Sequence, residues 1–125
     1  MTPEELRART KAFSLRVVRL VTSLPTGRVG NTFGSQLLRS ATSVAANYRA
    51  ACRARSYADF TSKLGLVEEE ADETAFWIEM VADAGLVKRA RVEKLLQEAR
   101  EVLAIITASR KTARSNRSAA KAAKR

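Results

Sequence analysis

Apolar residues recur every three or four positions along four stretches of this 125-residue chain. Such spacing places apolar side chains on one face of an α-helix, so each stretch predicts an amphipathic helix. Residues that interrupt helices are few, with only 5 Gly and 2 Pro in the whole sequence. The third stretch keeps a heptad spacing over several turns, through Phe60, Leu64, Val67, Ala71, Thr74, Ile78 and Val81. The pattern favours an all-α fold in which these apolar faces pack together.

Capping and turn-forming residues mark the ends of the expected helices. Thr2-Pro3-Glu4-Glu5 and Ser56-Tyr57-Ala58-Asp59 each have the spacing of a capping box. The stretch from Pro25 to Asn31 breaks the first helix, and Gly85 is a natural C-cap. The expected helices cover about residues 3–23, 32–53, 57–84 and 88–110. Their short connections predict one domain over residues 1–111, an antiparallel up-and-down four-helix bundle.

The net charge of +10 is unevenly distributed along the chain. Residues 6–58 carry ten bases and no acid, whereas residues 59–83 carry eight acids and one base. The last fifteen residues, 111–125, carry six bases and no acid. No large apolar residue follows Thr112, so we expect residues 112–125 to form a basic disordered tail.

Several classes of function are disfavoured by the composition. Histidine is absent, which removes the commonest catalytic base and metal ligand, so we expect no enzyme activity and no cofactor. An all-carboxylate magnesium site in the run Glu68–Glu73 is conceivable, but consecutive residues wind around a helix. We therefore expect no metal site, and expect these acids to pair with arginines of the other helices or to face water. Cys52 reads as a small buried residue. The longest apolar run, Val102–Ile106, cannot span a bilayer, and no signal peptide is visible, which favours a cytoplasmic protein.

The basic residues are the candidate contacts for nucleic acid, because guanidinium and ammonium groups bind phosphate. In the first helix Arg9, Arg16 and Arg19 share a broad face, which could equally be a solvated polar face. In the tail the bases form an electrostatic arm or serve only for solubility. The predicted set is Arg9, Arg16, Arg19, Arg53, Arg55, Lys111, Arg114, Arg117, Lys121, Lys124 and Arg125.

Other residues on the second helix have a second interpretation. For Arg39 and Asn47 we favour pairing or packing within the protein over phosphate contact. Tyr48 and Tyr57 could stack on bases, but their positions suit packing equally well.

The apolar faces are wider than one bundle core requires, which favours self-association over a wide monomer core. The additional apolar residues are Val18, Val21, Phe76, Trp77, Met80, Leu96 and Leu103.

The central stretch resembles a known family. It contains Arg39-Ser-Ala-Thr-Ser-Val-Ala-Ala-Asn47-Tyr-Arg, then Arg53-Ala-Arg-Ser-Tyr-Ala-Asp-Phe60, then the acidic run Glu68–Glu73 and Trp77. The combination is similar to the core motif of the four-helix-bundle family of bacterial rRNA intervening-sequence reading frames, over about residues 10–110. The resemblance implies a ring-shaped homopentamer of antiparallel bundles. It also implies a remote similarity to the accessory variability determinant of diversity-generating retroelements, a basic pentamer that works with a reverse transcriptase and nucleic acid.

These observations predict a non-catalytic oligomer that associates electrostatically with RNA or DNA as a scaffold or accessory factor. No known sequence-reading motif is present, so the expected mechanism is charge neutralisation along a multivalent basic surface. The alternative is a protein-interaction adaptor for a nucleic-acid enzyme such as a polymerase or reverse transcriptase.

Overall fold

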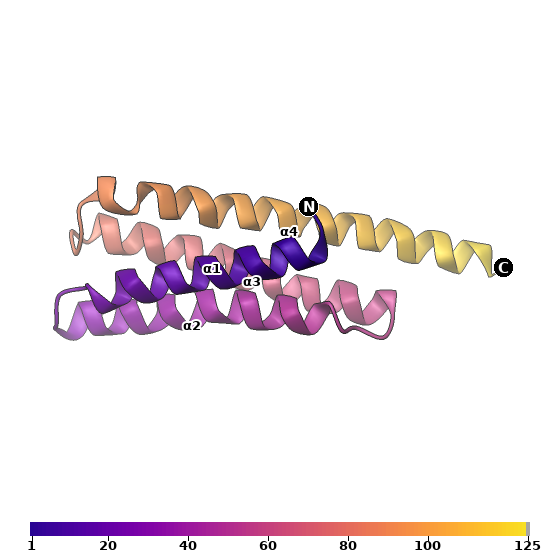
Figure 1. Ribbon diagram of the computed structural model, residues 1–125, viewed down its shortest axis with the longest axis horizontal. Helices are drawn as coiled ribbons and strands as arrows, with labels where there is room; N and C mark the ends of the chain where they lie inside the picture. Colours follow the sequence, from indigo (N-terminus) through magenta and orange to yellow (C-terminus); the bar gives the residue numbers. More distant parts are fainter. Residues whose placement is uncertain (125) are drawn as a thin grey trace.

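The computed structural model describes residues 1–124, and this part of the chain is all-α, with no strand. Its four helices lie side by side along the long axis, and each reverses the direction of the one before it (Figure 1). They are α1 (Pro3–Thr22), α2 (Arg28–Ala51), α3 (Tyr57–Asp83) and α4 (Arg89–Ala123). The extensive contacts are between α2 and α3 and between α3 and α4, while α1 packs mainly on α2. The prediction of an all-α fold with four helices is confirmed.

Two helices begin where the capping residues predicted. The Thr2 hydroxyl accepts a hydrogen bond from the Glu5 amide at 3.1 Å, and the Glu5 carboxylate accepts one from the Thr2 amide at 3.3 Å. At α3 the Ser56 hydroxyl accepts from the Asp59 amide at 3.1 Å. Asp59 also binds Lys63 one turn later at 2.5 Å. The hydrogen bonds to the Thr2 and Ser56 hydroxyls satisfy amides that the first turn of a helix would otherwise leave without partners.

The start of α2 differs from the sequence prediction, because the helix begins at Arg28 rather than near Thr32. Gly27 precedes it with φ 145°, a conformation that other residues rarely adopt. Gly30 already lies within the helix and packs against the turn from α1. A Cβ atom there would lie 2.2 Å from the carbonyl oxygen of Pro25. The loop is therefore shorter than its Gly and Pro content suggested, because Gly30 belongs to α2 and packs closely against the Pro25 backbone.

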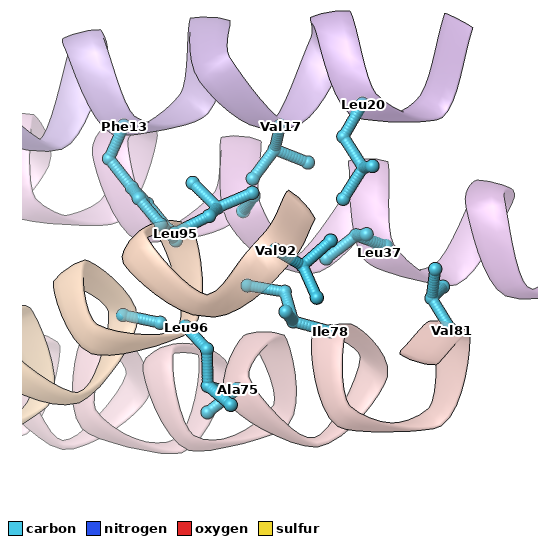
Figure 2. Packing of buried hydrophobic residues seen from close by; sticks show 12 residues of the cluster. Phe13, Val17, Leu20, Leu37, Ala75, Ile78, Val81, Val92, Leu95 and Leu96 are labelled. Atoms are coloured by element: carbon cyan, nitrogen blue, oxygen red, sulfur yellow. The ribbon is translucent and has the colours of Figure 1, made fainter. Parts of the chain in front are cut away.

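Side chains from all four helices meet in the core (Figure 2). In the cluster near the α1–α2 and α3–α4 turns, Phe13 and Val17 of α1 pack with Ile78 of α3 and Val92 of α4. A second cluster toward the other end contains Val44, Leu64, Val67, Val102 and Ile106, all essentially inaccessible to solvent. The apolar stripes of the four segments are thus buried against one another, as their spacing predicted.

The C-terminal segment is helical, which corrects the expectation of a disordered tail. α4 continues through Ala123 without interruption. No Gly or Pro follows Gly85, and the residues beyond Arg110 are mainly Ala, Lys and Arg, which have high helix propensity. Ala113 is buried against the bundle and anchors the segment. The last turns project beyond the other three helices (Figure 1). The scarcity of apolar residues after Thr112, which suggested disorder, is explained by a helix whose last turns have few neighbouring helices to pack against.

We predict that Gly30→Ala destabilises the fold although alanine is the better helix former. The added methyl group must displace the Pro25 backbone, which should lower the free energy of unfolding by about 1–3 kcal/mol. Gly65→Ala is the matched control, because a Cβ there meets the flexible end of the Arg110 side chain at 3.1 Å. Chemical denaturation of both variants measures the difference. Equal stabilities for the two variants would contradict the close approach at Gly30.

Candidate nucleic-acid interface

Arg9 links α1 to α4 through ion pairs with two glutamates. Its guanidinium donates to both carboxylate oxygens of Glu98, at 2.6 and 2.9 Å, and to Glu101 at 2.6 Å. The hydrogen bonds with Glu98 raise the pKa of Arg9, and the same contacts lower the pKa of Glu98. Arg9 was predicted as a nucleic-acid contact. In the structure its ion pairs connect α1 to α4, two helices that make few other contacts.

Several acidic residues of α3 pair with arginines of its neighbours and others, such as Glu69 and Asp72, are exposed, which are the two outcomes predicted. Arg39 of α2 binds Glu70 at 3.2 Å and also pairs with Glu73. Arg110 of α4 binds Glu68 at 3.3 Å. Burial acts to raise the pKa of the Glu73 carboxyl, but hydrogen bonds from Arg39 and Trp77 outweigh it and leave that pKa lowered.

The acids of α3 point in different directions around the helix. Within residues 1–124, no three His, Cys, Asp or Glu side chains gather in a way that could hold a metal ion. The amide of Asn47 donates to the carbonyl and hydroxyl oxygens of Ser43, at 3.0 and 2.8 Å, within its own helix. Asn47 and Arg39 therefore contact protein groups, the interpretation that the sequence favoured.

The helical C-terminal segment aligns five cations on one face, which we call the basic stripe. Its members follow one another at spacings of 4, 3, 4 and 3, and are Arg110, Arg114, Arg117, Lys121 and Lys124. This spacing keeps side chains on one side of a helix over about 21 Å of its axis. No acid follows Glu101 in the sequence. Like charges three and four residues apart repel one another, so a polyanion along the stripe would stabilise it. Lys111 lies to one side of the stripe, and Arg125 lies outside the described residues.

The turn between α2 and α3 brings further cations to the same end of the bundle. Arg53 and Arg55 are exposed there. Arg55 and Lys124 line one hollow of about 620 Å³, although they are far apart in the sequence. The fold therefore joins two of the three groups of predicted contacts, the exit of α2 and the C-terminal segment.

The third predicted group lies toward the opposite end of the bundle, on the seam between α1 and α4. Arg16 and Arg19 line a hollow of about 260 Å³ together with Arg91 of α4. Arg91 also donates to the Ser23 hydroxyl at 2.6 Å. Arg91 was not predicted, because it lies among both basic and acidic residues in the sequence. Only the packing of α4 on α1 brings it beside Arg16 and Arg19.

A further basic groove runs between α1 and α2 and was also missed. Arg7, Lys11 and Arg49 surround a hollow of about 400 Å³ whose floor consists of small residues such as Ala45 and Ala46. The bases were visible in the sequence as part of an acid-free stretch. Their convergence depends on the angle at which α1 crosses α2, which the sequence pattern does not contain.

The predicted self-association surface is only partly exposed. Phe76 of α3 remains 48% exposed and Val18 of α1 37% exposed. Leu96 is buried in the core, and the Trp77 ring packs against the Phe33 ring with centroids 5.3 Å apart. Leu66 was not singled out by its sequence position but is 50% exposed on α3. Two large apolar side chains therefore remain uncovered along the outer side of α3.

The two tyrosines differ in their availability. Tyr48 is only 5% exposed and forms part of the second core cluster with half-buried Cys52 against it. Burial, together with a hydrogen bond to Cys52, raises the pKa of the Tyr48 hydroxyl. Tyr57, at the first turn of α3, is 48% exposed. Packing therefore accounts for Tyr48 but not for the ring of Tyr57.

The described helices also bear on the class of protein. Between residues 1 and 124, no helix combines the length and apolar character needed to cross a membrane. What they form is a small four-helix protein with ion pairs between its helices and further cations toward its ends.

Comparisons with known proteins agree with this class. The family described as 23S rRNA-intervening sequence protein matches residues 4–108, and the chain belongs to that family. A solved structure with TM-score 0.82 and 30% identity is a protein with unknown function from the S23 ribosomal protein family of Bacteroides thetaiotaomicron VPI-5482. The alignment covers 89% of this chain and 99% of that one. Among curated proteins, no match was found. The resemblance drawn from the central motif is confirmed at the level of the family.

We predict that Glu98→Gln lowers the free energy of unfolding by about 1 kcal/mol at pH 7, because it weakens the bonds to Arg9. The pKa of Glu98 in the folded protein lies below its ordinary value of 4.5. The stabilisation is therefore complete above about pH 4.5 and is lost as the pH falls through the lowered pKa. Denaturation at pH 7 and pH 3 measures it. Glu93→Gln, an exposed residue of the same helix, is the control. A loss that stays the same at both pH values would contradict the ion pair.

Proposed function

We propose that this protein is a non-catalytic, oligomeric scaffold of the cytoplasm that binds nucleic acid electrostatically. The observation that carries the proposal is the basic stripe, a preformed helical row of cations in which Arg110 pairs with Glu68 and the four that follow lie beyond the last acid of the sequence. Phosphate contacts dominate the affinity of most nucleic-acid-binding proteins. A preformed helix does not lose backbone entropy on binding, as a disordered arm would.

The remaining cation groups extend the proposed surface. Arg53 and Arg55 lie at the same end as the stripe, and the α1–α2 groove with Arg7 and Lys11 approaches that end along α1. No described element presents a set of side chains arranged to read base edges in a duplex groove, so we assign binding without sequence preference. Oligomerisation would repeat these surfaces and increase avidity.

We further propose that the oligomer is a homopentamer. The number five comes from the family resemblance, whereas the tendency to associate is supported by Leu66 and Phe76, which are half exposed on α3. Exposed apolar residues on one helix of a small protein favour association with another surface. The acids Glu69 and Asp72 are exposed on the same helix and could pair with bases of a second copy.

The same α3 surface supports a second candidate function, a protein-interaction adaptor. Its apolar and acidic side chains could instead contact a nucleic-acid enzyme such as a polymerase or reverse transcriptase. In this case the basic stripe would still contact nucleic acid, and α3 would recruit the enzyme. The oligomeric state of the purified protein distinguishes the two uses of α3.

We predict that nucleic-acid binding depends on the alignment of the basic stripe and on salt. Replacing Arg114, Arg117, Lys121 and Lys124 with Gln should weaken binding to duplex DNA. It should also reduce the slope of log affinity against log salt by about 3–4, since each neutralised phosphate contributes about 0.9. Fluorescence anisotropy with labelled single- and double-stranded DNA and RNA across a salt series measures both. Circular dichroism confirms that α4 stays helical.

A variant of unchanged composition is the control for total charge. Exchanging Arg114 with Ser115, and Arg117 with Ser118, rotates two cations by about 100° around the helix. We expect weaker binding from this variant as well. Wild-type affinity in the exchanged variant would show that only the net charge matters. Absence of binding by the wild-type protein at about 50 mM salt would contradict the proposed function itself.

We predict that native mass spectrometry of the wild-type protein shows a pentamer of the 13.7 kDa chain. Leu66→Glu combined with Phe76→Glu should shift the population to smaller species, because charges would replace buried apolar contacts at the interface. Ala104→Glu combined with Thr107→Glu places the same charge on exposed positions of α4 and should leave the oligomer intact. A monomeric wild-type protein would contradict the assembly and favour the adaptor.

A further inference from the structure

We propose that the hollow at the basic end of the bundle holds an unpaired nucleobase, so that the protein prefers single-stranded to double-stranded nucleic acid. This inference rests on the proposed function and adds to it a site for the base and a preference for one form of nucleic acid. The hollow lies between the exit of α2, the start of α3 and the end of α4. Neither the family nor the net charge predicts a site of this kind.

The hollow combines aromatic walls with a cationic rim. Tyr57 and Phe60 of α3 line it, and Arg55 and Lys124 contribute the charges. None of the described residues that line it is acidic. Its volume of about 620 Å³ falls within the range of sites that hold small organic molecules. A nucleobase would stack on the aromatic side chains, and the phosphate of the same nucleotide would contact the cations.

The aromatic rings are positioned by the fold. Phe60 packs against the second core cluster, and the buried ring of Tyr48 lies behind the hollow. Tyr57 begins α3 directly after the Ser56 cap, so the cap determines where its backbone lies. The Tyr57 ring is nevertheless 48% exposed. A half-exposed ring held on a rigid helix loses little entropy when a flat ligand stacks on it.

A neighbouring hollow extends the same surface along α4. It has a volume of about 480 Å³ and shares Tyr57 and Phe60 with the first. Its other walls include Ile105 and Ala108 of α4. The two rings therefore separate two adjacent hollows beside the helix that carries the basic stripe. A strand whose phosphate contacts Lys124 can place one base in the first hollow and the neighbouring base across Tyr57 in the second.

This arrangement favours a single strand because bases in a duplex are already stacked and paired. Their faces cannot reach Tyr57 unless the duplex opens, which costs free energy. In a single strand every base has a free face, and stacking on an aromatic side chain is tolerant of sequence. The preference therefore requires no hydrogen bonds that read the base, and the absence of a sequence-reading motif is consistent with it.

The test compares Tyr57→Leu with Leu15→Ala, which removes an exposed apolar side chain of α1 outside both hollows. The probes are a fluorescein-labelled 12-nucleotide oligo(dA), its duplex with oligo(dT), and a 12-nucleotide strand with abasic central positions. Tyr57→Leu should weaken binding to oligo(dA) by about 5- to 100-fold. It should leave affinity for the duplex and for the abasic strand unchanged. Leu15→Ala should bind all three as the wild type does.

The outcomes separate this inference from the proposed function. If the wild-type protein binds none of the probes at low salt, the proposed function fails and the inference fails with it. If the wild-type protein binds but Tyr57→Leu and wild type have equal affinity for oligo(dA), only the inference is overturned. An equal loss on the abasic strand, or a change in oligomer mass on Tyr57→Leu, would also overturn it. A change in oligomer mass would mean that a segment of another copy occupies the hollow.

Discussion

The bundle depends on the burial of the apolar stripe of α3 between α2 and α4. Leu64, Val67, Ile78 and Val81 are inaccessible to solvent, and each side chain of this kind contributes about 1.5–3 kcal/mol when buried. α2 and α4 both make their most extensive contacts with α3. α1 is held more loosely, by its packing on α2, by the core cluster of Figure 2 and by the ion pairs of Arg9.

The same arrangement determines where charge is neutralised. Because α3 lies between two helices that carry arginines, three acids at its middle, Glu68, Glu70 and Glu73, are paired within the protein. Some acids lie near the ends, such as Glu4, which pairs with Arg7, and Asp83, which pairs with Arg89. Cations there gather on the α1–α4 seam, around the α2–α3 turn and along the end of α4. The excess positive charge is thus concentrated at particular places on the molecule, which a polyanion could contact without disturbing the internal pairs.

The continuation of α4 changes the physical picture of the C-terminal segment. As a disordered arm its cations would sample many separations, and binding would have to order them. As a helix they form a row with a repeat near 5.4 Å per turn, and Lys124 at its end lines a hollow with aromatic walls. In the proposed complex, electrostatic attraction and base stacking act at one end of the molecule, so the proposed scaffold function and the proposed preference for single strands depend on the same element.

The sequence by itself determined the number of helices, two of the helix starts and most of the core, because apolar spacing and capping are local properties. It also predicted that the acids of α3 pair with arginines of the other helices or face water, because consecutive residues wind around a helix and cannot all meet at one point. Only the tertiary structure decided which arginines are used internally. Arg9 meets Glu98, and Arg91 joins Arg16, through packing between helices at the two ends of the sequence. The exposure of Tyr57 beside Lys124 was decided in the same way, because composition carries no information about how far α4 extends past its neighbours.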